Sequence, residues 1–196
     1  MTSSPARLAI MLSGRGTNMT AIAENCRNGV LKGLAEVAVV VGNSPEARGL
    51  LASSKFGFPT VCVPSQGRSR EDFEYDLINV LNAHKPDFVV LAGFMRILSP
   101  VFIEAFRNRI INIHPADPEV YRGPSGYKYA FENKLPSTFI TVHYVDENVD
   151  TGNIICRREV SLLGADTLAE VEKRGLAVEH ILYSETLASL LESRKS

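Results

Sequence analysis

Along the first part of the chain, short apolar runs alternate with segments whose apolar residues recur at three- and four-residue intervals. The runs are rich in β-branched residues and predict buried strands at residues 8–12, 36–41, 59–63, 88–92 and 110–113. The periodic segments predict helices at residues 19–26, 45–56, 70–84 and 100–106. Strands that alternate with helices predict an α/β fold, a doubly wound and mostly parallel sheet.

The pattern changes after residue 113. A loop rich in proline and glycine covers residues 115–124, and a short helix is expected at residues 127–133. Two more strands, at residues 139–143 and 154–160, are joined by a polar loop, which favours antiparallel C-terminal strands over another crossover. A terminal helix is expected at residues 166–191, with an interruption at Gly175. We see no repeat or linker and expect residues 1–196 to form one domain.

The composition narrows the class of protein. Apolar residues make up 45% and charged residues 22% of the chain, which is typical of a globular protein. A formal net charge of −1 offers no basic excess for nucleic acid, and no apolar run is long enough to span a membrane. Cys26, Cys62 and Cys156 fit neither a disulfide framework nor a zinc motif. We therefore expect a cytoplasmic protein without nucleic-acid or membrane partners.

A glycine loop, Ser13-Gly14-Arg15-Gly16-Thr17-Asn18, connects the first strand to the first helix. Main-chain N–H groups and the helix N-terminus make such a loop suited to an anion. Met19 stands where the dinucleotide fingerprint needs its third glycine, and the Gly-Lys of a Walker loop is missing. The loop therefore suits a single phosphate, with the side chains of Thr17 and Asn18 as added donors. A tight turn without a ligand is an equally good interpretation of the loop alone.

A second polar feature ends the strand at residues 110–113. Asn112 and His114 are two residues apart and should project from the same face of the strand, which Pro115 ends. Ligands of open α/β sheets bind at such strand ends. An acid, Asp150, follows in the loop before the last strand, where a simple turn role is the more common one.

Four blocks carry a resemblance. They are Ser13 to Asn18, Leu91-Ala92-Gly93-Phe94-Met95-Arg96-Ile97-Leu98-Ser99-Pro100, Asn112-Ile113-His114-Pro115, and Val142-His143 through Asp150-Thr151-Gly152. In this order, over nearly the whole chain, they resemble the folate-dependent formyltransferases. The first two blocks point most narrowly to the branch of that family that formylates glycinamide ribonucleotide in purine synthesis.

The resemblance implies a site and its ligands. It makes Asn112, His114 and Asp150 catalytic and 10-formyltetrahydrofolate the co-substrate, with no metal. The implied folate-binding residues are Phe94, Met95, Arg96, Ile97, Leu98, Val145, Asp146, Glu147, Asn148 and Val149. The implied substrate-binding residues are Gly14, Arg15, Gly16, Thr17, Asn18 and Glu179. The second partner is then a small molecule that carries a phosphate and an amine; a monomer and a homodimer both remain open.

Formyl transfer to an amine passes through a tetrahedral intermediate with a developing oxyanion. Asn112 and a charged His114 can donate hydrogen bonds to that oxygen. Asp150 can keep the imidazole charged and accept the proton of the amine. Since no Cys-His pair is evident, direct attack of the amine fits better than a covalent intermediate.

One segment departs from the family. After His114-Pro115 the family usually continues Ser-Leu-Leu-Pro and later Gly-Leu-His-x-His-Arg, whereas this chain has Ala116-Asp117-Pro118-Glu119 and then Gly123 to Lys128. A different amine, or water as in formyltetrahydrofolate hydrolase, is therefore an alternative acceptor, and a binding domain without turnover is a third hypothesis. We expect His143 to be a buried core histidine, and we assign no role to it or to His180.

Overall fold

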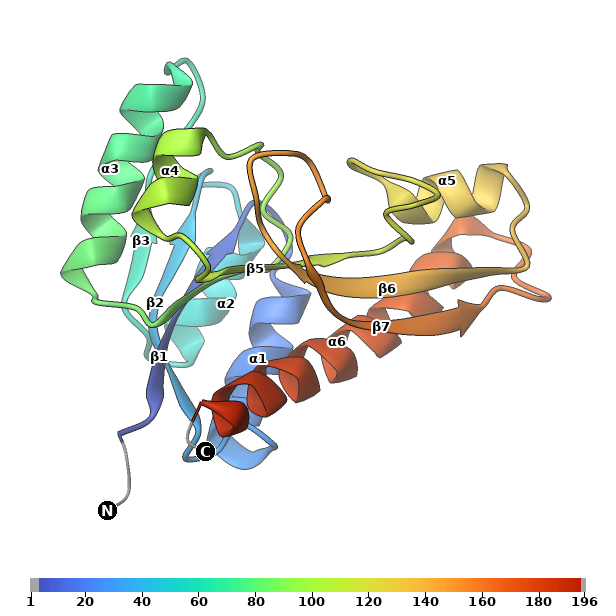
Figure 1. The fold of residues 1–196 in the computed structure, drawn as a ribbon, viewed down its shortest axis with the longest axis horizontal. Coiled ribbons are helices and arrows are strands. Elements are labelled where there is room, and N and C mark those ends of the chain that lie inside the picture. Colours follow the sequence, from blue (N-terminus) through green and yellow to red (C-terminus); the bar gives the residue numbers. More distant parts are fainter. Residues whose placement is uncertain (1–3, 195–196) are drawn as a thin grey trace.

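The computed structural model describes residues 4–194. Its strands are β1 (Ala6–Leu12), β2 (Ala35–Gly42), β3 (Thr60–Cys62), β4 (Phe88–Leu91), β5 (Ile110–His114), β6 (Ser137–Tyr144) and β7 (Ile154–Ser161). Its helices are α1 (Thr17–Asn28), α2 (Arg48–Lys55), α3 (Arg70–Ala83), α4 (Pro100–Ala105), α5 (Gly126–Glu132) and α6 (Leu168–Ser193) (Figure 1).

The strands form one sheet of seven in the order β3-β2-β1-β4-β5-β6-β7. Neighbouring strands from β3 to β5 pair in parallel, whereas β6 pairs antiparallel with both β5 and β7. This confirms the predicted doubly wound sheet with antiparallel C-terminal strands. The chain winds from β1 to β3 on one side and then returns to β4 on the other, so β1 and β4 meet at a switch point, where open α/β sheets bind ligands.

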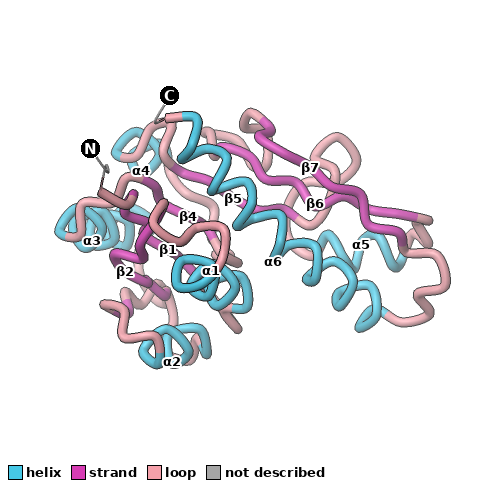
Figure 2. Tube along the Cα trace, turned by 90° about the horizontal axis from the view of Figure 1, so that it is seen from below, coloured by secondary structure: helices cyan, strands magenta, loops and turns pink. Residues whose placement is uncertain are grey.

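The two faces of the sheet have separate apolar cores because alternate residues of each strand point to opposite faces. Leu8 and Ile10 of β1 pack into the core that α1 and α6 cover. Ala9 and Met11 pack into the core that α3 and α4 cover. Figures 1 and 2 show the long helix α6 running along the sheet beside α1, with α5 near its N-terminal end.

Two predicted helices differ from the structure. The helix expected from residue 45 begins at Arg48 instead, because Ser44 first forms a turn in which its side chain accepts the N–H of Glu46. The expected interruption at Gly175 is wrong, since α6 is continuous over 26 residues. None of the described helices is long and apolar enough to cross a membrane.

Candidate active site

The tip of β5 carries the first two predicted catalytic side chains. Ile111 and Ile113 point into the core under α1 and α6. Asn112 and His114 alternate with them and therefore project to the opposite side, where both line a pocket. His114 is the last residue of the strand, and its ring is almost fully buried.

Asp150 approaches this tip from the loop between β6 and β7. Its Oδ2 atom lies 3.5 Å from Nδ1 of His114 and accepts the N–H of Gly123 over 2.9 Å. Its Oδ1 atom accepts from Nδ2 of Asn112 at 3.4 Å. The backbone of Asp150 is left-handed, with φ of 52°, a conformation that non-glycine residues hold where their surroundings fix it. The three predicted catalytic residues thus lie together.

The carboxylate of Asp150 is stabilised in its charged form. Burial by itself would raise the pKa of Asp150. The contact with His143, the N–H of Gly123 and the positive potential of both histidines outweigh that effect and hold the pKa below its ordinary value. Asp150 is therefore a carboxylate at neutral pH, suited to holding a charged imidazole or taking a proton.

His143 is a member of this cluster that the sequence analysis left without a role. It is 2% exposed, as expected of a core histidine, yet it also lines the pocket. Its Nε2 atom lies 3.3 Å from Nδ2 of Asn112 and 3.5 Å from Oδ1 of Asp150. His143 stands directly opposite Asn112 in the β5–β6 pair. Knowing the register of these two strands would therefore have placed His143 in the site.

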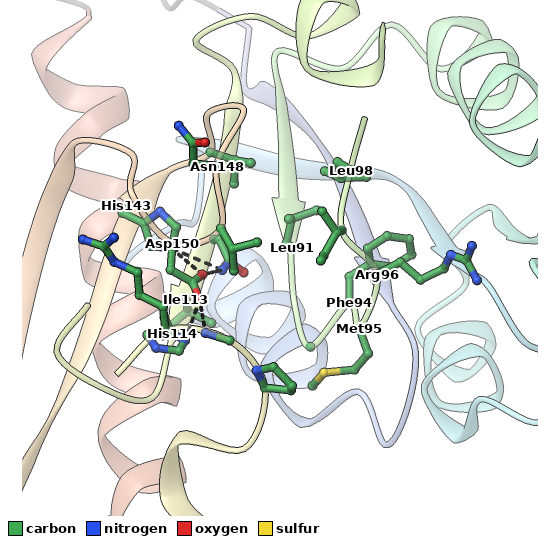
Figure 3. A pocket seen from close by; sticks show the side chains of 18 of the residues that line it. Leu91, Phe94, Met95, Arg96, Leu98, Ile113, His114, His143, Asn148 and Asp150 are labelled. Carbon is green, nitrogen blue, oxygen red and sulfur yellow. Dashed lines mark hydrogen bonds and ion pairs between the residues drawn. The ribbon is translucent and has the colours of Figure 1, made fainter. Parts of the chain in front are cut away.

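The cluster forms one wall of a pocket of about 640 Å³, a size typical of small-molecule sites. In Figure 3, His114, His143 and Asp150 lie on one side of the pocket, and Phe94, Met95 and Leu98 lie on the other. All ten residues implied for folate binding contribute to the lining: Phe94, Met95, Arg96, Ile97, Leu98, Val145, Asp146, Glu147, Asn148 and Val149. Their folate role stays a prediction.

The loop from residue 93 to residue 99 is held from behind by α3. The ring of Phe94 stacks on the ring of Phe73, with 6.5 Å between the ring centroids. The guanidinium of Arg96 also lies over the Phe73 ring and is directed away from the catalytic cluster (Figure 3). Glu74, which is 1% exposed, accepts hydrogen bonds from both the N–H and the hydroxyl of Ser99. A rigid helix thus supports the apolar wall of the pocket.

The glycine loop lies beside this wall. Ser13 donates its N–H to the Gly93 carbonyl at 3.0 Å, and its hydroxyl accepts the N–H of Met95 at 2.8 Å. Gly16 begins α1 with φ of 76°, and a Cβ atom there would lie 2.6 Å from Cα of Gly49. Glycine is therefore required at residue 16 for both backbone conformation and space.

The remaining substrate-binding candidates fall into two groups. Gly14 and Arg15 are exposed at the start of the loop, with Thr17 half-buried beside them. Asn18 is buried, and its amide donates to the carboxylate of Glu179 on α6. Asn18 therefore holds the loop to α6 inside the protein. An anion can reach the exposed part of the loop.

Glu179 also accepts a hydrogen bond from the hydroxyl of Tyr127 on α5. Burial, together with the charge of Glu179, raises the pKa of Tyr127, so this hydroxyl remains a donor. The divergent segment at residues 123–128 thus reaches the same carboxylate as the glycine loop. Sequence reasoning missed Tyr127. The family pattern has histidines in this segment, and this chain has none there.

The residues present suit an organic co-substrate. The pocket combines an apolar wall with polar groups at one end, the usual composition of a site for a largely apolar ligand. Within residues 4–194, no three histidine, cysteine, aspartate or glutamate side chains are grouped so as to hold a metal ion. The three cysteines are free and half-buried.

The sheet order and the pocket define an α/β protein with a pocket at the carboxyl ends of β4 and β5, beside the switch point, where ligands of such sheets bind. A family model described as formyl transferase matches residues 6–187. The chain belongs to the formyl transferase family, which confirms the resemblance drawn from its four sequence blocks.

Its relatives include single enzymes and parts of larger ones. The chain is 32% identical over 188 residues to phosphoribosylglycinamide formyltransferase of Escherichia coli (strain K12), covering 95% of this chain and 88% of the other. It is 36% identical to the trifunctional purine biosynthetic protein adenosine-3 of Drosophila pseudoobscura pseudoobscura, covering 94% of this chain but 14% of that protein. Phosphoribosylglycinamide formyltransferase from Bacillus halodurans has a similar structure, with a TM-score of 0.90, 36% identity and coverage of 94% and 95%.

Proposed function

We propose that this chain transfers the formyl group of 10-formyltetrahydrofolate to the amine of glycinamide ribonucleotide, in purine synthesis. Relatives similar over nearly their whole length bear that enzyme's name. The single observation that carries the proposal is the convergence of Asn112, His114 and Asp150, from β5 and the β6–β7 loop, on one end of a pocket. The free, half-buried thiols suit a reducing compartment such as the cytoplasm.

In the proposed reaction the pocket lined by Phe94 to Leu98 and Val145 to Val149 holds the folate, which supplies the formyl group. Asn112 and His114 donate to the formyl oxygen as negative charge develops on it. Their contacts with Asp150, at 3.4 and 3.5 Å, are at the outer limit of hydrogen bonding, so an arriving oxygen can replace them. Asp150 holds the imidazole in place and takes the proton of the attacking amine. As the intermediate collapses, the bond between the formyl carbon and N10 of the folate breaks, and N10 receives that proton, so tetrahydrofolate leaves.

The acceptor is placed by the glycine loop. Its exposed residues, Gly14 and Arg15, together with the half-buried Thr17, bind the phosphate, while Asn18 and Glu179 support the loop from inside. The bond between Ser13 and Met95 sets the spacing of the phosphate from the folate pocket. The amine then meets the formyl carbon at the β5 tip, between the two ligands.

The test is an assay with purified protein and the formyl donor. Folate release is followed with glycinamide ribonucleotide, with other amines, and with no acceptor. Release that requires glycinamide ribonucleotide supports the proposal; equal release without an acceptor would indicate a hydrolase instead. His114→Ala should abolish turnover but keep folate binding. The matched control is His84→Ala, because His84 lies at the end of α3, outside the pocket lining.

A further inference from the structure

The loop that leaves β5 contacts both members of the proposed acid–base pair. We call residues 117–124 the Asp117 loop. The carbonyl oxygen of Tyr121 lies 3.0 Å from Nε2 of His114. The N–H of Gly123 donates to Oδ2 of Asp150 over 2.9 Å. One loop thus provides a main-chain acceptor to the histidine and a main-chain donor to the aspartate.

These contacts determine which nitrogen of the His114 ring faces Asp150. Since Nε2 faces the Tyr121 carbonyl, Nδ1 is the ring nitrogen turned toward Asp150, at 3.5 Å. Both ring nitrogens face acceptors, and both bonds form together only when each nitrogen carries a proton. The loop therefore fixes the orientation of the ring and leaves Nδ1 as the nitrogen that faces Asp150.

Asp117 organises this loop. Its carbonyl oxygen accepts the N–H groups of Val120 and Tyr121, each at 2.9 Å. Its side-chain Oδ1 accepts the N–H of Glu119 at 2.9 Å, and Oδ2 accepts from Nη1 of Arg157 at 3.1 Å. The turn that delivers the Tyr121 carbonyl is thus built on one aspartate, which is tied to β7 by an ion pair.

The ion pair is placed where it can hold the loop. Arg157 stands opposite Thr141 in the β6–β7 register, and the Thr141 hydroxyl donates to the Ala116 carbonyl at 2.8 Å. The side chain of Asp117 is 14% exposed, whereas that of Arg157 is 45% exposed. Because the carboxylate is mostly shielded from water while the guanidinium is almost half exposed, solvent screens this pair less than it screens an ion pair with two exposed partners.

We propose that Asp117 and Arg157 are positioning residues that act on His114 and Asp150 through the backbone of the Asp117 loop. The proposal rests on the proposed function, since it takes these two groups as the reacting ones. Neither positioning residue lines the pocket, so neither is expected to bind folate.

The test compares Arg157→Gln with Arg158→Gln. The two arginines are neighbours on β7, have side-chain exposures of 45% and 44%, and each pairs with one carboxylate, but Arg158 pairs with Glu185 on α6. In Arg157→Gln we expect kcat to fall about tenfold through misplacement of the acid–base pair, with an unchanged KM for the formyl donor. Arg157→Lys should restore most of the rate, and Arg158→Gln should match the wild type.

A pH profile separates positioning from general damage. The groups that face Asp150 are His114 and the amide of Asn112 from β5, His143 from β6 and the N–H of Gly123. The Gly123 bond is one of the interactions that lower the pKa of Asp150. Its loss in Arg157→Gln should move the acidic limb of the kcat profile to higher pH, and this limb should not move in Arg158→Gln.

Two NMR measurements need no turnover: hydrogen exchange of the Gly123 amide and titration of the Asp150 carboxyl carbon. Arg157→Gln should speed the exchange and raise the titration midpoint. A wild-type exchange rate and a wild-type titration midpoint in Arg157→Gln would overturn the positioning role. Equal changes in Arg157→Gln and Arg158→Gln would overturn it as well. An inactive wild type would instead overturn the proposed function, and the NMR measurements would still decide whether the ion pair holds the loop.

Discussion

His143 stands directly across the β5–β6 pair from Asn112, with 3.3 Å between its Nε2 atom and the Asn112 amide nitrogen. Its Nδ1 atom lies 2.8 Å from the carbonyl of Tyr144, so Nδ1 carries a proton. The other ring nitrogen, Nε2, then faces both the amide nitrogen of Asn112, at 3.3 Å, and Oδ1 of Asp150, at 3.5 Å. The pairing fixes the amide of Asn112 with its nitrogen toward the cluster.

The first prediction follows from this pairing. Asn112→Ala should lower kcat by about 10²–10³ through loss of an oxyanion donor. His143→Ala should lower kcat less, because it frees the amide without removing it. In a double-mutant cycle, His143→Ala should cost little in the Asn112→Ala background, since both changes act on one interaction. Fully additive losses would show that His143 acts independently of Asn112.

The second prediction concerns Asp150 and acid. Its pKa lies below the usual value, so around pH 4 the unfolded chain binds more protons at this group than the folded chain does. The stabilisation is therefore complete above the ordinary aspartate pKa and is lost as pH falls through the folded-state pKa. Asp150→Asn, which tolerates the left-handed backbone, should lower the free energy of unfolding at neutral pH by about 1–3 kcal/mol.

Urea unfolding at a series of pH values measures this difference. It should be constant at neutral pH and shrink below about pH 4. Asp166→Asn, at an exposed carboxylate in the turn before α6, provides the comparison. A difference between wild type and Asp150→Asn that does not change with pH would show that the carboxylate charge contributes nothing to stability.

The fold was predictable because its signals are local. The apolar runs of β1, β2, β4 and β5 are mostly buried on both faces, and such a run can be recognised from its own residues alone. The register that brings His143 opposite Asn112 depends on where two distant strands pair, which one sequence does not specify. The unbroken α6 has a similar cause: a glycine is costly in a helix, but here the Tyr127 ring occupies the space above Gly175.

Parts of the site were predictable for another reason. The folate candidates and the Asn-His-Asp set came from family blocks, and the structure places each group around one pocket. The Asp117 loop contacts the site through main-chain atoms of Tyr121 and Gly123. Any residue type can make such contacts, so the sequence does not indicate them. Such contacts are visible only once the backbone is placed.

The third prediction concerns Gly175 and Tyr127. In an exposed helix, Gly→Ala stabilises by about 1 kcal/mol. At Gly175 the new Cβ would lie 2.1 Å from Cε1 of Tyr127. Gly175→Ala should therefore destabilise the protein, by about 1–3 kcal/mol, and displace the ring that donates to Glu179. The KM for the acceptor should rise, and that for the folate donor should not.

Thermal unfolding and steady-state kinetics test both parts. Ala177→Gly, at an exposed position of α6, calibrates the intrinsic cost of glycine in this helix. Tyr127→Ala should remove most of the penalty of Gly175→Ala, because it removes the clashing ring. If Gly175→Ala stabilised the protein, the close packing of Tyr127 on α6 would be wrong.

The fourth prediction concerns the support of the folate wall. Glu74 receives two hydrogen bonds from Ser99, directly after Leu98. In Glu74→Gln one of these donors faces an amide N–H instead of a carboxylate oxygen, so the loop loses its fixed position. Binding of the formyl donor would then have to order the loop, at a cost in conformational entropy. The Kd of the donor should therefore rise about three- to tenfold. The effect on kcat at saturating donor should be small, because the catalytic cluster lies on the opposite wall.

Glu71→Gln is the matched control, since Glu71 lies on the same helix, one turn earlier, with its side chain exposed. Donor binding by calorimetry and unfolding by urea would be measured for both variants. Glu74→Gln should weaken binding and lower stability, because a buried partner of Ser99 is lost. Glu71→Gln should leave donor binding unchanged and should lower stability less, because it removes only an exposed charge from the first turn of α3. If Glu74→Gln lost stability but bound the donor as tightly as the wild type, Glu74 would support the fold alone, and the rigidity of the pocket wall would have to come from the stacking of Phe94 on Phe73.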